Sequence, residues 1–207
     1  MSNMSRNLIC YITFILLAIA SCSNERGILP EESLPYDSLR EGDLVFRRGR
    51  NMTSNIIIAK DSYNYSHIGI LHKSDSGWCV IHAVNDEHDF NGDFDRVKID
   101  RIETFFSQDR ASAGAIAHNF VSDSIANYMT SLALQHVIDS TRFDSEFILN
   151  DNSALYCTEF IHILHKAIGT DITEGRRTPV GLVGFPNEII FPSDVLKNKN
   201  LHIYFIY

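Results

Sequence analysis

The sequence predicts an α+β domain in which an antiparallel sheet packs against helices. Short β-rich runs gather in the first half of the 207-residue chain, and two long segments with helical periodicity follow them. Strands and helices that are segregated along the chain in this way are typical of α+β folds. No repeat and no low-complexity tract interrupts this pattern.

The predicted strands are short apolar or alternating runs bounded by turn residues. The first is "GDLVF" at 42–46. The runs "YSHIGILHK" (65–73) and "GWCVIHAV" (77–84) are joined by "SDSG" and predict an antiparallel hairpin. Further strand candidates are "DRVKIDRI" (95–102), "AGAIAHNF" (113–120) and "HIYFIY" (202–207).

Two earlier helices are expected before the one that carries a cysteine. The run "TSNIIIAKDS" (53–62) predicts a short helix capped at Thr53 or Ser54. Residues 122–139 have helical spacing behind a Ser122 cap. The apolar face expected for this second helix consists of Ile125, Tyr128, Met129, Leu132 and His136.

The stretch "LYCTEFIHILHKAIG" (155–169) predicts the last long helix, capped near Asn152 or Ser153 and closed by Gly169. Cys157 then lies about one turn into the helix. We expect its face to pack onto the sheet and His162 to face solvent. The residues that follow Cys157 on its side at helical spacing are Phe160, Ile161, Leu164 and Ile168.

The N-terminus predicts export. Arg6 is the only charged residue before the apolar run "LICYITFILLAIASC", which ends in small residues. A basic start, a short apolar region and a small-residue cleavage site are typical of a secretory signal over 1–21. Cys22 after Ile-Ala-Ser resembles the lipobox of bacterial lipoproteins, in which that cysteine is lipidated. The alternative is a plain anchor helix, for which about 15 residues are too few.

Removal of 1–21 leaves 186 residues, enough for one domain with a sizeable core. Residues 22–40 contain two prolines and three glutamates without sustained periodicity, and predict a lipidated tether. The catalytic domain is then expected over 41–207. The mature chain, 22–207, would carry 17 basic and 26 acidic residues, an acidic balance that argues against nucleic acid as a partner.

Cysteine usage narrows the candidate nucleophile. Cys10 falls in the signal and Cys22 at the lipidation site, which leaves Cys79 and Cys157. A disulfide between them is possible in an oxidising envelope, but a domain of this size does not need one. A buried structural thiol, half of a disulfide and a catalytic nucleophile therefore stay open for Cys157 at this point.

The alternation of side chains along a strand distinguishes Cys79 from Cys157 as candidate nucleophile. Alternate residues of a strand share a face, so His67 of the first hairpin strand and His82 of the second can face the same side of the sheet. Cys79 then points away from them and is most simply a small apolar residue of the reverse face. Any thiol chemistry is expected to use Cys157 with His67 and His82.

A cysteine near a helix N-terminus is favoured as thiolate, and a nearby imidazolium lowers its pKa further. Cys paired with His, and a third group that orients the His, is what an activated thiol nucleophile requires. From the residues alone, a core cysteine and two unrelated strand histidines remain possible. A zinc site at His67, His82 and Cys157 is a further alternative, although no HExxH or paired CxxC supports it.

The segments "EGDLVF", "YSHIGIL", "VIHAV" and "LYCTEFIH", in this order, resemble the permuted papain-like amidases of the YiiX/YaeF type, which are circularly permuted relatives of NlpC-type cysteine peptidases. The resemblance covers residues 41–207. It implies a circularly permuted papain-like (NlpC-like) fold, in which the His strand leads and the catalytic Cys lies on a late helix. By this resemblance Cys157 is the nucleophile and His67 the base.

The third catalytic position departs from the resemblance. The family commonly has Glu there, whereas this chain has His82. The related lecithin-retinol acyltransferase group uses a second histidine, but an imidazole supplies no fixed negative charge. Asp86, Glu87 and His88 are alternatives for this role, although the run "NDEHDFNGDFD" is more typical of a solvated loop.

The expected function is hydrolysis of an amide bond through a Cys–His thioester mechanism, with peptidoglycan stem peptides or related envelope peptides as substrate. Tyr156, Tyr65 and Glu159 flank the motifs and are candidates for substrate contact. No cofactor and no metal are expected, and the chain is expected to be anchored to a membrane of the cell envelope by Cys22. The alternatives are a lipid acyltransferase or thioesterase of the same fold and a catalytically inactive binding lipoprotein.

Overall fold

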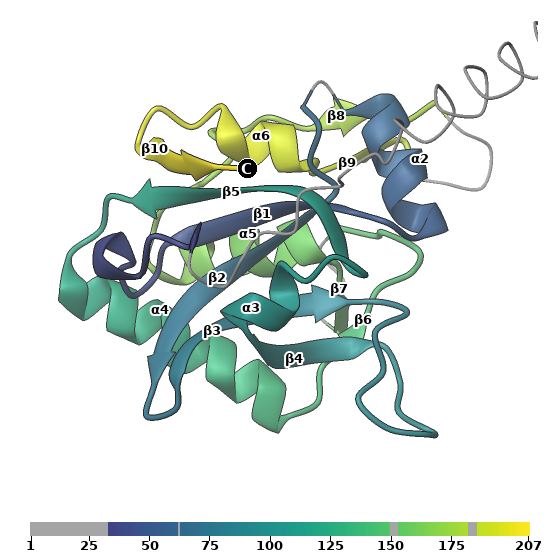
Figure 1. Ribbon diagram of the computed structural model, residues 1–207. Coiled ribbons are helices and arrows are strands. Elements are labelled where there is room, and N and C mark those ends of the chain that lie inside the picture. Colours follow the sequence, from purple (N-terminus) through teal and green to yellow (C-terminus); the bar gives the residue numbers. More distant parts are fainter. Residues whose placement is uncertain (1–32, 62, 150–152, 182–185) are drawn as a thin grey trace, which may run out of the picture.

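The computed structural model describes residues 33–207 except 62, 150–152 and 182–185. The predicted signal peptide, Cys22 and most of the predicted tether lie outside these residues. In the described part of the chain, no helix is long and apolar enough to span a bilayer. A central sheet forms one layer, and the long helices α4 (Asp123–Ile138) and α5 (Cys157–Ala167) lie against it (Figure 1).

The main sheet of the described residues has eight strands in the order β10-β5-β1-β2-β3-β4-β6-β7. The six strands from β10 to β4 are all antiparallel to their neighbours, and the two-residue strands β6 and β7 extend the β4 edge. The α+β prediction is therefore confirmed. The strands are β1 (Leu44–Gly49), β2 (His67–Ser74), β3 (Gly77–Val84), β4 (Arg96–Arg101), β5 (Ala111–Asn119), β6 (Arg142–Phe143), β7 (Ala154–Leu155) and β10 (Leu201–Ile206).

Smaller elements complete the described fold. The strands β8 (Thr178–Pro179) and β9 (Glu188–Ile189) pair as a separate short ribbon. The remaining helices are η2 (Tyr36–Ser38), α2 (Met52–Lys60), α3 (Ile102–Phe105) and α6 (Pro192–Leu196). Helix α2 begins after Asn51, whose side chain accepts a hydrogen bond from the Ser54 backbone N–H, so the predicted cap at Thr53 or Ser54 is wrong by two to three residues.

The predicted hairpin is confirmed, and its register fixes the faces of the two strands. Ile70 lies opposite Ile81 and His72 opposite Cys79. Continuing this register places His67 and His82 on one face and Cys79 on the other. The parity argument from the sequence therefore holds for all three residues.

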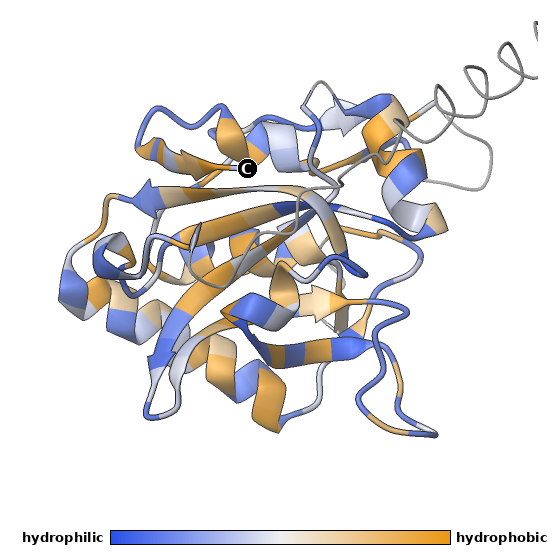
Figure 2. Cartoon of the chain, in the orientation of Figure 1, coloured by the Kyte–Doolittle hydropathy of each residue, from blue (hydrophilic) through white to orange (hydrophobic). Residues whose placement is uncertain are grey.

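Apolar residues fill both faces of the sheet, as the orange strands of Figure 2 indicate. On one face, Ile68, Ile70 and Ile81 pack with α4 and α5 in the larger core. On the other face, Val45, Leu71 and Val80 pack with residues of α3 and with part of β5 in a smaller core. The sheet is therefore covered on both sides, which leaves its ends as the places where a cavity can open.

The buried face of α4 is rotated from the predicted one. Ser122 caps the helix as expected, but Ile125 and Tyr128 are exposed. Met129 is buried in the core as predicted, and Leu132 packs against that core. The small residues Ala126 and Ala133 are buried in place of Ile125 and Tyr128. Small side chains allow the helix to approach closely, and hydrophobicity alone did not reveal this.

Helix α5 starts later than predicted. Its first residue is Cys157 and its N-cap is Tyr156, so the cap predicted at Ser153 is wrong. Ala154 and Leu155 pair with β6 as strand β7, and this pairing keeps them extended. Gly169 follows the helix with a positive φ of 76°, as expected for a residue that ends a helix.

His162 is also placed differently from the prediction, because it is buried rather than exposed. Its ring lies 3.4 Å from the Asp171 carboxylate and 3.3 Å from the Arg177 guanidinium. These two residues belong to the segment after α5, which covers the side of the helix that was expected to face solvent. The predicted packing of Phe160 and its neighbours on the sheet side is confirmed.

Candidate active site

The two histidines of the hairpin, His67 and His82, meet at one end of the sheet. Both imidazoles are buried and both pack on Phe105 of α3. The ring centroids of Phe105 and His67 are 5.7 Å apart in a stacked arrangement, and those of Phe105 and His82 are 5.2 Å apart edge to face. The phenyl ring therefore fixes the orientation of both histidines.

The two histidines and Asp100 of β4 form a hydrogen-bonded chain, which we call the relay cluster. His67 Nε2 lies 2.8 Å from His82 Nδ1, and His82 Nε2 lies 3.1 Å from Asp100 Oδ2. An ionised carboxylate only accepts, so His82 donates through Nε2 and accepts through Nδ1. His67 must then donate through Nε2, which leaves a lone pair on its Nδ1.

Cations hold Asp100 in its ionised form. Burial opposes ionisation, but the hydrogen bond with His82 and the charges of Lys98 and Arg110 outweigh it, so the pKa of Asp100 lies below its usual value. Arg110 donates to Asp100 Oδ2 at 2.6 Å, and Lys98 Nζ lies 3.2 Å from Oδ1. The relay cluster therefore ends in the fixed negative charge that a second imidazole alone does not provide.

Both imidazoles are neutral at physiological pH. Burial, the Arg47 guanidinium and His82 hold the pKa of His67 well below its usual value. Burial also lowers the pKa of His82, although Asp100 opposes the shift. His67 is thus a neutral base whose free lone pair is on Nδ1.

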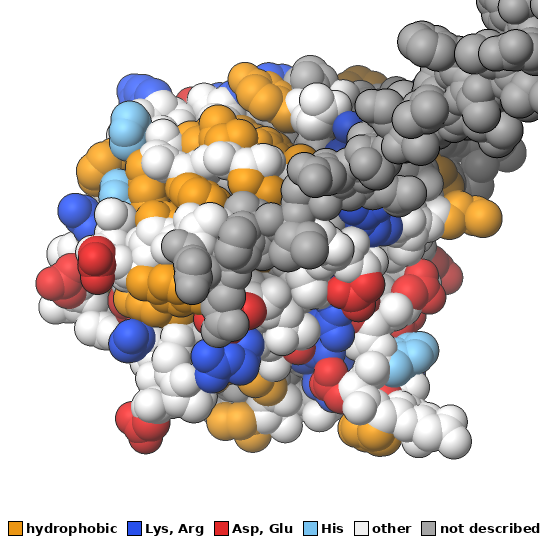
Figure 3. All heavy atoms as spheres, in the orientation of Figure 1, with side chains coloured by type: hydrophobic (Ala, Val, Ile, Leu, Met, Phe, Trp, Pro, Cys, Tyr) orange, Lys and Arg blue, Asp and Glu red, His pale blue; other side chains and the backbone are white. Residues whose placement is uncertain are grey.

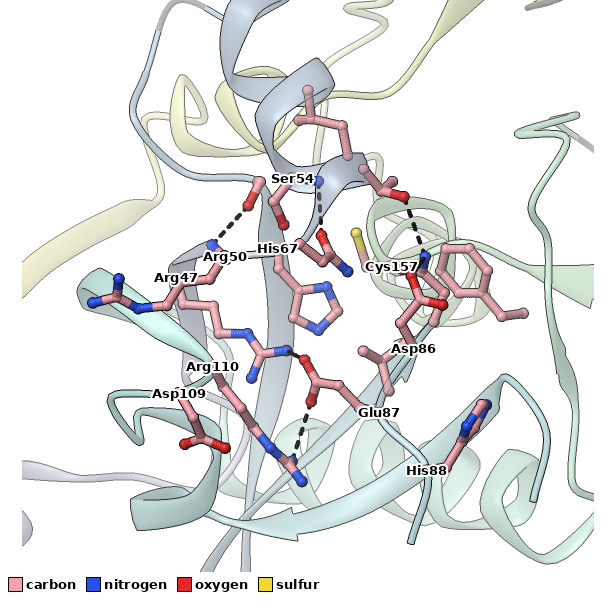
Figure 4. Close-up of a pocket in the computed structure, with 18 of the residues that line it drawn as sticks. Arg47, Arg50, Ser54, His67, Asp86, Glu87, His88, Asp109, Arg110 and Cys157 are labelled. Atoms are coloured by element: carbon pink, nitrogen blue, oxygen red, sulfur yellow. Dashed lines mark hydrogen bonds and ion pairs between the residues drawn. The ribbon is translucent and has the colours of Figure 1, made fainter. Parts of the chain in front are cut away.

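Cys157 lines the same cavity as His67 (Figure 4). Cys157 belongs to the core between the sheet and the long helices, whereas the two histidines pack on α3 across the sheet. The thiol therefore approaches the histidines at the end of β2, where the sheet no longer separates them. The cysteine is 5 % exposed. Burial raises the pKa of its thiol to about 11, although backbone hydrogen bonds at Ile68 and Thr158 favour the thiolate. The expected stabilised thiolate is therefore not present, because desolvation exceeds the effect of the helix N-terminus.

The cavity around these groups has a volume of about 280 Å³. Its lining includes the apolar side chains of Phe143 and Phe147 and a group of charged residues. Among the charged residues, Arg47 and Arg110 both pair with the Glu87 carboxylate. Figure 3 shows basic and acidic side chains next to one another on the face that Figure 1 presents, to the right of α3.

The loop after β3 is mostly exposed to solvent, as the sequence predicts, and Lys98 of β4 contacts its first half. Lys98, only 2 % exposed, donates to the Glu87 carbonyl at 3.1 Å and pairs with Asp89. Asp86 has a positive φ of 60°, an uncommon backbone conformation for this residue type. Asp86, Glu87 and His88 line the cavity as a result.

The orienting group is nevertheless Asp100 behind His82, and none of the three loop alternatives bonds to either histidine. Sequence reasoning missed Asp100. The signal was present, because "DRVKIDRI" was a predicted strand and Lys98 lies opposite His82. Asp100 is two residues further and so shares that face.

The three residues predicted to contact substrate do not line the cavity. Tyr156 and Glu159 are each 1 % exposed, since α5 is covered on several sides. The Tyr156 hydroxyl accepts a hydrogen bond from the Ile190 backbone N–H at 3.2 Å, which gives it a structural position. Tyr65 packs on Phe46, with ring centroids 6.0 Å apart. Their positions do not support the expected substrate contacts.

Cys79 lies away from the cavity, as parity predicted. It is buried near the turn of the hairpin, where its Sγ lies 3.5 Å from the Ser74 hydroxyl. Cys79 and Cys157 are both free thiols, so the disulfide alternative is not realised. Among the described residues, no group of three or more His, Cys, Asp or Glu has an arrangement suited to a metal ion.

No protein-family model and no curated protein matches the chain. Among solved structures, it is similar to the crystal structure of metalloprotein yiiX from Escherichia coli O157:H7, with a TM-score of 0.65 and 15 % identity. The match covers 81 % of this chain and 97 % of that chain. The chain has a YiiX-like fold. In this YiiX-like fold the strand that carries His67 precedes the helix that carries Cys157.

Proposed function

We propose that the protein is a cysteine hydrolase of the permuted papain-like type, which cleaves an amide bond. The single observation that carries the proposal is that the hydrogen-bonded relay from Asp100 through His82 leaves the free Nδ1 of His67 in a cavity that Cys157 also lines. A thiol, a base and a group that orients the base are the components of nucleophilic catalysis by cysteine.

The reaction would begin from a neutral thiol. His67 Nδ1 takes the proton of Cys157 while the sulfur attacks the amide carbonyl, and a tetrahedral oxyanion forms. The imidazolium of His67 is then stabilised through His82 by the charge of Asp100. His67 returns the proton to the leaving nitrogen, which departs as an amine. A water molecule, deprotonated by His67, then hydrolyses the thioester and releases a carboxylic acid.

The start of α5 is a suitable place for the oxyanion. The helix begins at Cys157, and no side chain caps this end of it. The backbone N–H groups of the first turn have no partner within the helix and lie at the positive end of its dipole. We assign the backbone N–H of Cys157 as one donor to the oxyanion.

The proposed substrate is a peptidoglycan stem peptide or a related peptide of the cell envelope. This part of the proposal rests on the lipobox-like sequence at Cys22, which would tether the enzyme to a membrane of the envelope. Transfer of the acyl group to an acceptor other than water would use the same thioester intermediate, so the two reactions differ only in what enters the cavity second.

A metal-dependent role is the second candidate, because the solved structure of similar fold is described as a metalloprotein. In this chain the imidazole nitrogens that face each other are 2.8 Å apart, the distance of a direct hydrogen bond. A metal at His67 and Cys157 would have to use the remaining Nδ1. Metal analysis of the purified protein, before and after chelation, with hydrolysis measured on both samples, distinguishes this role from thiol catalysis.

The deciding experiment compares Cys157→Ala with Cys79→Ala in the protein without residues 1–21. We expect the first variant to lose hydrolysis of muropeptides and of model peptide amides, and the second to retain it. Circular dichroism and urea unfolding verify that both variants are folded. Full hydrolysis by Cys157→Ala, or a wild-type protein that cleaves no amide and forms no covalent adduct at Cys157, would refute the proposal.

A further inference from the structure

A second hollow adjoins the cavity that contains Cys157, and we propose that it binds a short aliphatic side chain on the acyl half of the substrate. We call this second hollow the trough. The inference rests on the proposed function, since it assigns one half of the substrate to a place next to the nucleophile.

The trough has a volume of about 140 Å³ and is mainly apolar. Thr53, Ile57 and Phe147 line both the trough and the catalytic cavity, so the two hollows meet between α2 and Phe147. The apolar residues that line the trough alone are Ile56, Val180, Ile189 and Phe191.

The position of the trough relative to the two catalytic groups identifies which half of the substrate it would hold. Phe147 packs on Tyr156, the residue before Cys157, with ring centroids 5.3 Å apart. The trough therefore opens on the Cys157 side of the cavity. The charged residues lie on the His67 side, where Arg47 stacks over Phe105 next to the imidazole.

The chemistry of the reaction then indicates which side of the cavity holds the acyl half of the substrate and which holds the leaving amine. The carbonyl carbon becomes bonded to the sulfur of Cys157, so the acyl half must extend from that atom. The leaving nitrogen receives its proton from His67 and must lie on the charged side. An apolar group of the acyl half can reach the trough, whereas an apolar leaving group would lie among Arg47, Glu87 and Arg110.

The size of the trough limits its occupant. An apolar cavity of about 150 Å³ in a protein core binds benzene, so a trough of about 140 Å³ has room for an apolar group of about that size. This matches an aliphatic amino-acid side chain and is too small for the chain of a membrane lipid. The inference therefore favours peptide-like substrates over long-chain acyl lipids.

The test uses alkyl chloromethyl ketones, which place a carbonyl and an alkyl chain where the acyl half would lie. The sulfur of Cys157 forms a bond to the methylene carbon, chloride leaves with its electron pair, and His67 takes the thiol proton. Chains from methyl to dodecyl are compared by their second-order rate constants of alkylation. Peptide mapping by mass spectrometry assigns each adduct to Cys157 or to Cys79. The measurement does not require turnover.

We expect the rate at Cys157 to rise about four-fold for each methylene, up to about four methylenes, and then to level off. An ether of equal length should lose most of the gain. Ile56→Glu places a charge in the trough and should bring the butyl-to-methyl rate ratio close to one. Met52→Glu is the matched control on the same helix; Met52 is 79 % exposed, lines neither hollow and should leave the ratio unchanged. Ile56 itself is 40 % exposed, so its substitution should be tolerated by the fold.

Three outcomes would overturn the inference: equal rates for all chains, a rate that keeps rising to dodecyl, or no alkylation of Cys157 at all. Failure of the proposed function looks different. In that case the rates would depend on chain length as described, but the wild-type protein would hydrolyse no amide. Conversely, if an enzyme that hydrolyses amides through Cys157 reacts at equal rates with all chains, the proposed role of the trough is refuted and the proposed function stands.

Discussion

In the described part of the chain, two clusters join a histidine to a buried aspartate, and they lie at opposite ends of β1. The relay cluster of His67, His82 and Asp100 reaches, through His67, the cavity that Cys157 also lines. A second group, which we call the distal cluster, consists of Asp43, His118 and Tyr204. His118 Nδ1 lies 3.0 Å from Asp43 Oδ2, and its ring stacks on Tyr204 with centroids 3.9 Å apart.

The clusters look alike in their local contacts but differ in charge. Lys98 and Arg110 flank Asp100 and keep its pKa low. Asp43 has only neutral donors and His118 beside it, including the Tyr204 hydroxyl and the Arg40 backbone N–H. Burial consequently raises the pKa of Asp43 despite these partners.

The clusters also differ in what lies beyond the histidine. His67 keeps a lone pair on Nδ1 and lines the same cavity as the Cys157 thiol, whereas the distal cluster lines neither this cavity nor the trough. A histidine with an aspartate partner is therefore not sufficient for a catalytic site. The nucleophile and the space for a substrate make the difference.

The largest expected effect separates the two histidines. His67→Gln should lower kcat/KM for amide hydrolysis by about 10³-fold, because it removes the proposed general base. His118→Gln should leave kcat/KM within about two-fold and lower the free energy of unfolding by about 1 kcal/mol, because it breaks a partly buried hydrogen bond. Hydrolysis assays and urea unfolding of both variants measure this. Equal losses of activity would mean that the relay cluster has no special role.

The protonation state of Cys157 gives the next largest effect. Because its thiol is neutral at pH 7 and has a pKa of about 11, its alkylation by iodoacetamide should increase about tenfold per pH unit from pH 7 to 10. A cysteine in an unstructured peptide, with a pKa of about 8.5, should level off within this range. A rate that is already constant from pH 5 upward would show a thiolate–imidazolium pair and contradict the neutral resting state.

A smaller effect is expected for the aspartates. Asp100→Asn should lower kcat/KM by about 10- to 100-fold. An amide can donate to His82 Nε2, so the proton of His82 moves to Nδ1, which then cannot accept from His67. Asp43→Asn should leave kcat/KM unchanged.

A second readout distinguishes this positioning role of Asp100 from simple damage to the fold. Loss of the negative charge destabilises the imidazolium of His67, so the acid limb of the pH profile should move to lower pH. Asp100→Glu should recover part of the activity. An unchanged pH profile, or equal losses for Asp100→Asn and Asp43→Asn, would assign Asp100 a structural role only.

The sequence was sufficient to predict the elements that carry strong local signals. The hairpin is predicted by two alternating runs joined by one turn. The same alternation predicts which residues share a face of the sheet, and so that His67 and His82 lie on the same side. A late helix with Cys157 near its N-terminus follows from 3.6-residue periodicity, although the helix begins later than predicted. These signals depend only on neighbours in the sequence, and the structure confirms them.

The features that the sequence did not predict depend on contacts between distant segments. Asp100 could be found only once the β3–β4 register was known, since it bonds His82 from the neighbouring strand. The burial of His162 and Glu159 follows from the segment after α5, which folds back over the helix. The raised pKa of Cys157 likewise reflects desolvation by residues far away in the chain.

The smallest expected effect concerns stability in acid, where the two aspartates act in opposite directions. The folded-state pKa of Asp100 is below the unfolded value of about 3.9, so its contribution to stability is present above that value and is lost as pH falls further. The folded-state pKa of Asp43 is above the unfolded value. Its ionised form therefore costs stability at neutral pH, and the protein regains that stability as pH falls through the folded-state pKa of Asp43.

Urea unfolding between pH 6 and pH 2, followed by the fluorescence of Trp78, the only tryptophan, measures both slopes. Asp100→Asn should flatten the loss of stability below pH 4 by about 1 kcal/mol. Asp43→Asn should remove the compensating gain, so the loss would begin at higher pH than in the wild type. The slopes are compared rather than the absolute stabilities, because Asp100→Asn also weakens the pairing of the buried Lys98 at every pH. If the free energy of unfolding depends on pH in the same way for both variants, the two carboxylates have the same environment. The two clusters would then differ only in that one of them lines a cavity.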